Sequence, residues 1–210
     1  MIEIRHRITG AVLHIVNADT LVGNKLRGVR LANADCACML MTAIDLGHAC
    51  LTEVDFGEAE LEDAQFASAL LTKVRFDRAS LVHADFSDSM IVDTSFQNSG
   101  LREASFRYAR ITDADFRGAD LRGANLSMAN ISGTLRGANL PGADLRGADI
   151  RDADLTDAVL DGVKLANAKV VGATLNPIHR QLVQTMKNGV TAQAALPTAV
   201  HPRPWWQFWS

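Results

Sequence analysis

The sequence predicts a repeat protein, a solenoid built from many short stacked units. Residues 114 to 130 give the main observation, because they repeat a five-residue unit with Ala first, Asp or Asn second and usually a large apolar residue third. A helix has a period of about 3.6 residues and a strand a period of two, so neither explains a strict period of five. Internal repetition of this kind indicates stacked supersecondary units.

The register of the unit extends far in both directions. Counted in fives from Phe116, an apolar residue occupies every central position from Leu21 to Ile131. After one missing residue, the count resumes at Leu135 and continues to Leu175. This gives 32 units, of which 20 carry Ala two positions before the centre. We expect these two positions to point inward and the other three to face solvent, where carboxylates are solvated.

These residues resemble the pentapeptide-repeat family, whose consensus is Ala, Asp or Asn, Leu or Phe, and two variable residues. The resemblance covers residues 17–177. It implies an all-β fold, a right-handed parallel β-helix of square cross-section in which four units form the four faces of a coil. Taken four to a coil, the units make about eight coils, stacked about 4.8 Å apart.

Within this β-helix, the register makes two structural predictions. The seven Phe residues of the repeat region recur every twenty residues on two opposed faces, so we expect two stacked aromatic ladders inside it. The missing residue lies in I-S-G-T-L, residues 131 to 135, where Gly133 stands at a position usually held by Ala. A unit of four residues predicts a local kink or a tightened corner in the sixth coil.

The N-terminal segment, residues 1–16, is not repetitive. Apolar residues alternate with polar ones up to Thr9-Gly10, and β-forming residues follow, which predicts a hairpin or two short strands. The expected role is to cap the open end of the β-helix, because exposed coil ends leave backbone groups unpaired. Recognition of a partner by this segment is the alternative.

At the other end, residues 178–189 are predicted to form a short capping α-helix. Asn176 and Pro177 are typical of a helix start, and Asn188-Gly189 is typical of its end. In several members of the family that the chain resembles, a C-terminal helical segment also forms a two-fold dimer. A homodimer through this helix is therefore an additional hypothesis that the resemblance suggests.

Residues 190–210 form a tail rich in Pro and Trp. Its last six residues include Trp205, Trp206, Phe208 and Trp209, an apolar content that is unusual for a solvated tail. One interpretation is that the tail folds back on the protein's own surface or on a dimer partner. The other is a docking peptide for another protein or a membrane interface, because aromatic residues dominate binding hot spots.

The sequence contains no pattern typical of an active site. Its six His residues are scattered, and no nucleotide-binding or hydrolase motif is present, so we expect no enzyme activity, cofactor or metal. The three Cys residues form no CxxC pair, which favours free thiols in a reducing cytoplasm. No apolar run approaches the roughly 18 residues of a membrane span. A non-enzymatic scaffold or protein-interaction module is the leading hypothesis.

The charge distribution suggests a second hypothesis. Residues 35–93 hold twelve acidic residues against three basic ones. Acidic rods in the family resemble DNA, bind DNA gyrase or topoisomerase IV and protect against quinolones, without binding nucleic acid themselves. The alternative is a solvated surface of mixed charge. The tightest acidic cluster comprises Glu53, Asp55, Glu58, Glu60, Glu62 and Asp63.

Overall fold

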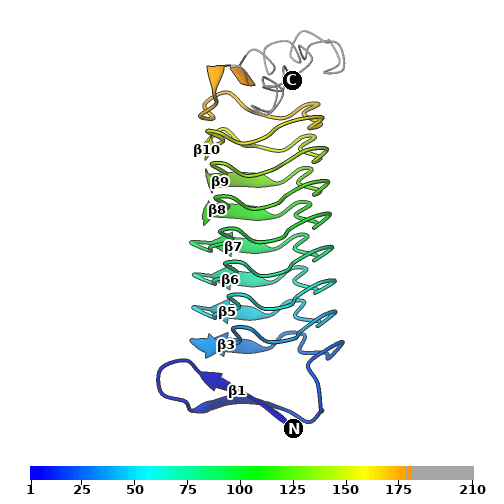
Figure 1. The fold of residues 1–210 in the computed structure, drawn as a ribbon, viewed down its shortest axis with the longest axis vertical. Coiled ribbons are helices and arrows are strands. Elements are labelled where there is room, and N and C mark those ends of the chain that lie inside the picture. Colours follow the sequence, from blue (N-terminus) through cyan, green and yellow to red (C-terminus); the bar gives the residue numbers. More distant parts are fainter. Residues whose placement is uncertain (178, 181–210) are drawn as a thin grey trace, which may run out of the picture. The chain divides into compact units, whose positions relative to one another are not determined.

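The computed structural model describes residues 1–177, 179 and 180, and it divides the chain into two units, residues 1–176 and 177–210. Within the first unit, successive turns of the chain stack in parallel to form a β-solenoid (Figure 1). The all-β repeat architecture predicted from the sequence is therefore confirmed.

One face of the solenoid carries a seven-stranded parallel sheet in the order β10-β9-β8-β7-β6-β5-β3. Neighbouring strands are related by twenty residues, as in the pairing of Leu51 with Leu71. The strands are β3 (Arg30–Ala32), β5 (Cys50–Thr52), β6 (Leu70–Thr72), β7 (Met90–Val92), β8 (Arg110–Asp115), β9 (Asn130–Thr134) and β10 (Ala153–Asp154).

The other faces are joined by single parallel bridges at the same spacing. Asp45 pairs with Gln65 and Gln65 pairs with Asp85, whereas Asp120 pairs with Asn139, one residue earlier, because of the missing residue. Backbone N–H groups of each coil donate to carbonyls of the next, for example Phe86 N to Ser105 O at 2.7 Å. The coils are therefore held together by backbone hydrogen bonds on every side.

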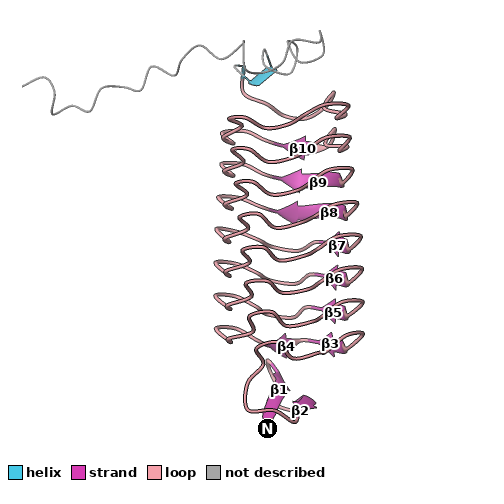
Figure 2. Ribbon diagram, turned by 90° about the vertical axis from the view of Figure 1, so that its right-hand side faces the viewer, coloured by secondary structure: helices cyan, strands magenta, loops and turns pink. Residues whose placement is uncertain are grey.

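An antiparallel hairpin covers the N-terminal end of the first unit, as predicted. It consists of β1 (Ile2–His6) and β2 (Val12–Val16), and β1 also pairs with β4 (Ala34–Asp35) of the first coil. Ile4 and Val16 are buried against the end of the core. Figure 2 shows the hairpin beyond β3 and β4. The pairing of β1 with β4 therefore satisfies backbone N–H and C=O groups that the first coil would otherwise expose.

The core contains the two predicted aromatic ladders. Neighbouring rings within each ladder are 4.7–5.1 Å apart and nearly parallel. The two ladders also touch each other edge to face, with centroids 5.4–6.1 Å apart, a contact that the sequence did not predict. One ladder is Phe56, Phe76, Phe96 and Phe116, and the other is Phe66, Phe86 and Phe106.

The small inward position tolerates a hydroxyl group when the backbone can satisfy it. Ser89, Thr94 and Ser99 replace Ala in consecutive units and are buried. Ser89 donates to the carbonyl of Phe86 at 2.7 Å, and Ser99 donates to that of Phe96 at 2.8 Å. These side chains therefore leave no polar group unpaired in the core.

Each corner of the coil is turned by the residue two positions after the centre, which usually has a positive φ. Glu58 (59°), Asp63 (57°) and Tyr108 (60°) are examples. An L-residue in this conformation costs roughly 1–2 kcal/mol, and β-branched residues fit it worst. None of the non-glycine residues with positive φ in the described part of the chain is Val, Ile or Thr.

The Asp of the consensus stabilises the corner that follows it. Its carboxylate accepts a hydrogen bond from the backbone N–H two residues later, as between Asp55 and Gly57 at 2.8 Å. Where Arg stands at that later position, its guanidinium also binds the same carboxylate, as in Arg151–Asp149 at 2.7 Å. The expectation that these carboxylates are simply solvated is therefore wrong. The same pairing occurs in Asp115–Arg117, Asp120–Arg122 and Asp144–Arg146.

At the missing residue, the sequence predicted a kink or a tightened corner in the sixth coil, and the structure shows a bulge in the pairing of β8 with β9. The register between β8 and β9 shifts between Ile111 and Ala114, after which Ala114 pairs with Gly133. Gly133 has a φ of 117°, and a Cβ atom there would lie 2.2 Å from the carbonyl oxygen of Ala114. Glycine is required because neither its conformation nor the space around it admits a side chain.

Little of the predicted C-terminal helix falls within the described residues. Pro177, His179 and Arg180 have helical conformation, and the remainder of residues 178–189 lies outside them. The tail with Trp205, Trp206, Phe208 and Trp209 also lies outside them. In the described part of the chain, no helix has both the length and the apolar character needed to cross a membrane.

The bulge leads to a prediction about stability. Gly133→Ala should lower the free energy of unfolding by about 3 kcal/mol or more, because it adds a steric clash to an unfavourable φ. Gly142→Ala is the matched control: it also has a positive φ, but nothing lies within 4 Å of its Cβ position. The Gly142→Ala variant should lose about 1–2 kcal/mol of the free energy of unfolding. Urea denaturation compares the two, and equal losses would contradict this account of Gly133.

The Asp–Arg pairs lead to a prediction about acid stability. The hydrogen bond from Arg151 lowers the pKa of Asp149 from 3.8 to about 2, and the equivalent bonds from Arg122 and Arg146 lower the pKa values of Asp120 and Asp144. A folded-state pKa below the unfolded value gives stability that is present above the unfolded pKa. That stability should be lost as the pH falls from about 4 towards about 2.

Denaturation midpoints measured against pH test this, with Asp149→Asn as the variant. It should lower stability at neutral pH and flatten the decline in acid. Asp161→Asn is the control, because Asp161 is exposed and has no ion pair within the described residues. If Asp149→Asn and the unchanged protein declined in parallel, the pair would not contribute to acid sensitivity.

Candidate interaction surfaces

The residues of the predicted acidic cluster lie on one coil, but they do not form one surface. They occupy three consecutive corners and the two faces between them, since each corner residue follows its centre by two positions. Asp55 is buried with 5% exposure, Glu53 is half-buried, and the remaining four are exposed. The exposed residues are Glu58, Glu60, Glu62 and Asp63.

The next coil places basic groups directly beside these acids. Arg75 forms an ion pair with Asp55, and Arg78 lies 3.1 Å from Glu58. The hydrogen bond with Asp55 raises the pKa of Arg75 above its usual value. Each acid and its partner are twenty residues apart, which is the spacing of neighbouring coils. Part of the negative charge of this cluster is therefore neutralised within the protein.

The remaining acids of the cluster have weaker or neutral partners. The carboxylate of Asp63 lies 3.4 Å from Nδ1 of His83, and that imidazole also lies 3.6 Å from Glu103 of the following coil. Glu62 accepts a hydrogen bond from the hydroxyl of Ser80 at 2.8 Å. Glu60 and Glu62 form no ion pair within the described residues. They are the acids most available to a partner.

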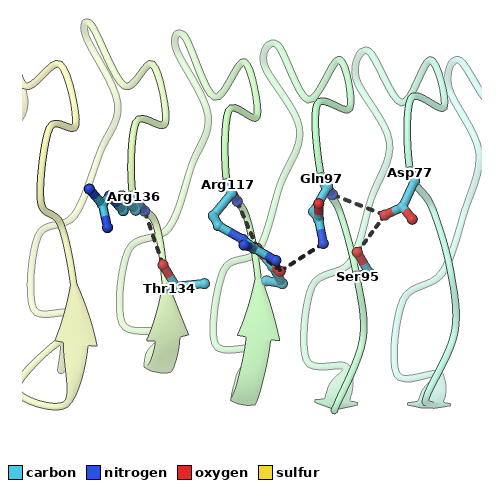
Figure 3. Close-up of polar contacts among 7 residues, drawn as sticks. Asp77, Ser95, Gln97, Arg117, Thr134 and Arg136 are labelled. Atoms are coloured by element: carbon cyan, nitrogen blue, oxygen red, sulfur yellow. Dashed lines mark hydrogen bonds and ion pairs between the residues drawn. The ribbon is translucent and has the colours of Figure 1, made fainter.

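The face over the Phe56 ladder carries a polar network that is satisfied internally (Figure 3). Asp77 accepts hydrogen bonds from the hydroxyl of Ser95 and from the backbone N–H of Gln97. The amide of Gln97 donates to Asp115 at 2.9 Å, and Asp115 also binds Arg117. The network therefore connects successive coils and leaves few polar groups here without a partner.

One region of the solenoid exposes large apolar side chains on several neighbouring coils. We call Leu70, Met90, Tyr108 and Met128 the apolar ridge. Their exposed fractions are 39%, 45%, 45% and 55%. Leu70 pairs with Met90 across neighbouring coils, and Tyr108 donates its backbone N–H to Ser127, next to Met128. Neighbouring exposed apolar residues of this kind commonly mark interaction sites.

A groove of about 580 Å³ lies along the apolar ridge. Met90, Tyr108 and Met128 contribute its apolar walls, and Met side chains adapt their shape readily to different ligands. Asp88 stands near Tyr108 and adds one negative charge. The lining residues are Asp88, Ser89, Met90, Tyr108, Ala109, Arg110, Met128 and Asn130.

Two arginines lie at the groove, Arg110 in its lining and Arg107 through its contact with Tyr108. Arg107 stacks on Tyr108, with its guanidinium carbon 4.6 Å from the ring centre, and donates to the Tyr108 hydroxyl at 3.0 Å. Arg110 lines the groove itself. Neither forms an ion pair within the described residues, in contrast to the arginines that follow a consensus Asp. The groove therefore combines apolar contact with charge that an acidic group can pair.

Sequence reasoning missed the apolar ridge, although the register contained a signal for it. Leu70 and Met90 stand one position before a centre, and Tyr108 and Met128 stand two positions after one. Both positions face outward in the five-residue unit. Large apolar residues there contradict the pattern of the unit, and this marks them as candidates for binding.

No described group of residues suggests a reactive centre. Cys36 is buried at a central position, and burial, with Asp35 and Asp55 nearby, raises the pKa of its thiol to about 12. A thiol of this kind is unreactive at neutral pH. Among residues 1–177, 179 and 180, no three His, Cys, Asp or Glu side chains are arranged to hold a metal ion.

Comparison with solved structures supports the fold. A trypsin-treated variant of QnrB1, a plasmid-mediated fluoroquinolone resistance protein, superposes with a TM-score of 0.52 over 82% of this chain and 97% of its own, at 18% identity. HetL of the cyanobacterium Nostoc, a pentapeptide repeat protein involved in heterocyst differentiation regulation, matches with 25% identity over 75% of this chain and 88% of its own, with a TM-score of 0.30. At this identity, the likeness to QnrB1 shows a shared fold.

Sequence comparison identifies the family. No curated protein matches the chain significantly. The pattern that defines pentapeptide repeats, in contrast, matches in 8 copies, over residues 49–88, 59–98, 101–135 and 134–167. These matches cover more than half of the chain and fall on the coils described above. The chain therefore belongs to the pentapeptide repeat family.

Proposed function

We propose that this protein is a non-enzymatic, rod-like protein-interaction module whose repeat region binds a partner at the apolar ridge. The apolar ridge itself is the observation that carries the proposal. Elsewhere, many outward polar side chains pair with a neighbouring coil or within their own unit. At the ridge, apolar side chains are exposed beside a groove instead.

The chemistry of the groove defines the kind of partner. Met90, Tyr108 and Met128 favour an aliphatic or aromatic side chain, because burying such a group removes apolar surface from water. Arg107 and Arg110 favour a nearby carboxylate, because neither forms an ion pair within the described residues. A protein segment with an apolar anchor beside an acidic residue satisfies both conditions.

The aromatic tail is a second proposed contact within the same function. Trp205, Trp206, Phe208 and Trp209 are residue types that dominate binding hot spots. A homodimer through residues 178–189 also remains a proposal. These contacts are independent of the apolar ridge, so experiments can separate them.

Quantitative affinity capture tests the proposal with three altered chains. Tyr108→Ala combined with Met128→Ser should reduce capture of a ridge-dependent partner roughly tenfold or more, because both apolar walls are lost. Leu40→Ser is the matched control, since Leu40 is also exposed, with 53% exposure, but lies outside the groove. A chain ending at Pro204 tests the tail.

The outcomes are distinct. A partner lost only with the Tyr108 and Met128 changes supports the ridge, and a partner lost only on truncation assigns binding to the tail. Identical partners for all four chains would show that neither the apolar ridge nor the tail determines binding.

The acidic segment supports a second candidate, a DNA-mimicking binder of DNA gyrase or topoisomerase IV that protects against quinolones. Glu60 and Glu62, which are exposed and form no ion pair within the described residues, favour it. Pairing of Asp55 and Glu58 with arginines weakens the phosphate-like charge that such a mimic needs.

A gyrase supercoiling assay, with and without a quinolone, tests this candidate. If the protein is a DNA mimic, it should alter supercoiling in a salt-dependent manner, and Glu58→Lys, Glu60→Lys and Glu62→Lys together should abolish the effect. Asp161→Lys is the control, because it reverses an exposed charge elsewhere in the repeat region. Absence of any effect up to tens of micromolar would reject the candidate.

A further inference from the structure

The N-terminal hairpin ends in a strand that no other strand covers in the described structure. The sheet order is β2-β1-β4, so β1 is paired on both sides and β2 on one side only. In Figure 2, the hairpin lies at the N-terminal end of the first unit, beyond the stacked coils. A strand with one open edge presents unpaired backbone N–H and C=O groups to another chain.

β2 lacks the residues that normally protect such an edge. Its sequence, V-L-H-I-V, contains no Lys, Arg, Asp, Glu or Pro. Glu3 and Arg5 lie on β1 and form an ion pair with each other, and Arg7 of the turn lies 3.9 Å from Asp55 of the solenoid. Glu3 and Arg5 are therefore one strand away from the open edge, and their charges are already paired.

The exposed side of β2 is also apolar. Val12, Leu13 and Ile15 are 42%, 38% and 49% exposed, whereas Val16 is buried. A bulge explains why these three lie together: Ile4 pairs with His14 and Arg5 pairs with Val12, so Leu13 is the extra residue. The strand thus combines an open edge with apolar side chains that remain in water.

The sequence of β2 is self-complementary. It reads V-L-H-I-V, with His14 at its centre and aliphatic residues placed symmetrically on either side. In an antiparallel pair around a two-fold axis at His14, Leu13 of one chain lies opposite Ile15 of the other, and Ile15 lies opposite Leu13. Aliphatic pairs directly opposite each other stabilise antiparallel strands. A two-fold contact requires this kind of symmetry.

We propose that the hairpin is a dimerisation surface, in which β2 pairs antiparallel with β2 of a second copy of this chain. The pairing joins the two hairpins into one continuous sheet and uses both open edges, so it closes at two copies. It does not depend on the proposed ridge partner, and it differs from a dimer formed through residues 178–189.

Sedimentation velocity of the full chain tests the proposal between about 1 and 100 µM. The chain of 22.7 kDa should sediment as a dimer at the upper end of this range. Ile15→Lys should weaken the dimer roughly tenfold or more, because a charge then stands at each end of the paired segment. Ile8→Lys is the matched control: Ile8 is 78% exposed in the hairpin turn, outside β2, and this variant should remain dimeric.

A mixture of two variants tests the register itself. Leu13→Glu alone should also weaken the dimer. Mixed with Ile15→Lys, it should form a heterodimer, because the new Glu of one chain lies opposite the new Lys of the other. Thermal melts of each variant establish that the fold is retained.

The contrary results are equally clear. A monomer throughout the concentration range, or self-association that Ile15→Lys leaves as tight as in the original chain, would overturn the proposal. Dissociation of the dimer by Ile8→Lys would show that the interface is not confined to β2. Failure of the two variants to associate would overturn the antiparallel register.

Discussion

Closure of each coil within about twenty residues is the constraint on which the rest of this structure depends. A short coil can close only if the chain turns sharply every five residues, and a left-handed residue makes most of these turns. Once the coils close, backbone groups of one coil meet those of the next on all sides. The energetic cost of many unfavourable φ angles is offset by this dense hydrogen bonding and by the filled interior.

The same constraint orders the outer surface into columns with a twenty-residue repeat. A side chain therefore has its counterparts in the coils on either side as neighbours. Arg75 meets Asp55 and Arg78 meets Glu58 for this reason. The polar network from Asp77 to Arg117 follows the same rule. Charge counted along the sequence overstates the field outside such a surface, because acids and bases of neighbouring coils cancel.

Much of the fold could be predicted from the sequence, and less of the candidate surfaces. The spacing of Phe66, Phe86 and Phe106 predicts stacking because one coil equals one repeat period. Edge-to-face contact between the two ladders depends on the width of the interior. The spacing of residues in the sequence does not specify that width. Asp149 and Arg151 flank an inward residue, so their proximity was accessible, but their hydrogen bonds also require the geometry of the turn. The groove beside Met90 and Met128 depends on side-chain conformations.

The aromatic ladders have a consequence for the apolar ridge. Phe56 to Phe116 fill the coils that carry Leu70, Met90 and Tyr108, so the exposed side chains stand on a core of buried, stacked rings. The backbone beneath the groove therefore has little conformational freedom to lose when a ligand binds. Association at such a preorganised surface costs less entropy than ordering a loop would. A ligand bound here would therefore lose little binding free energy to ordering of the backbone.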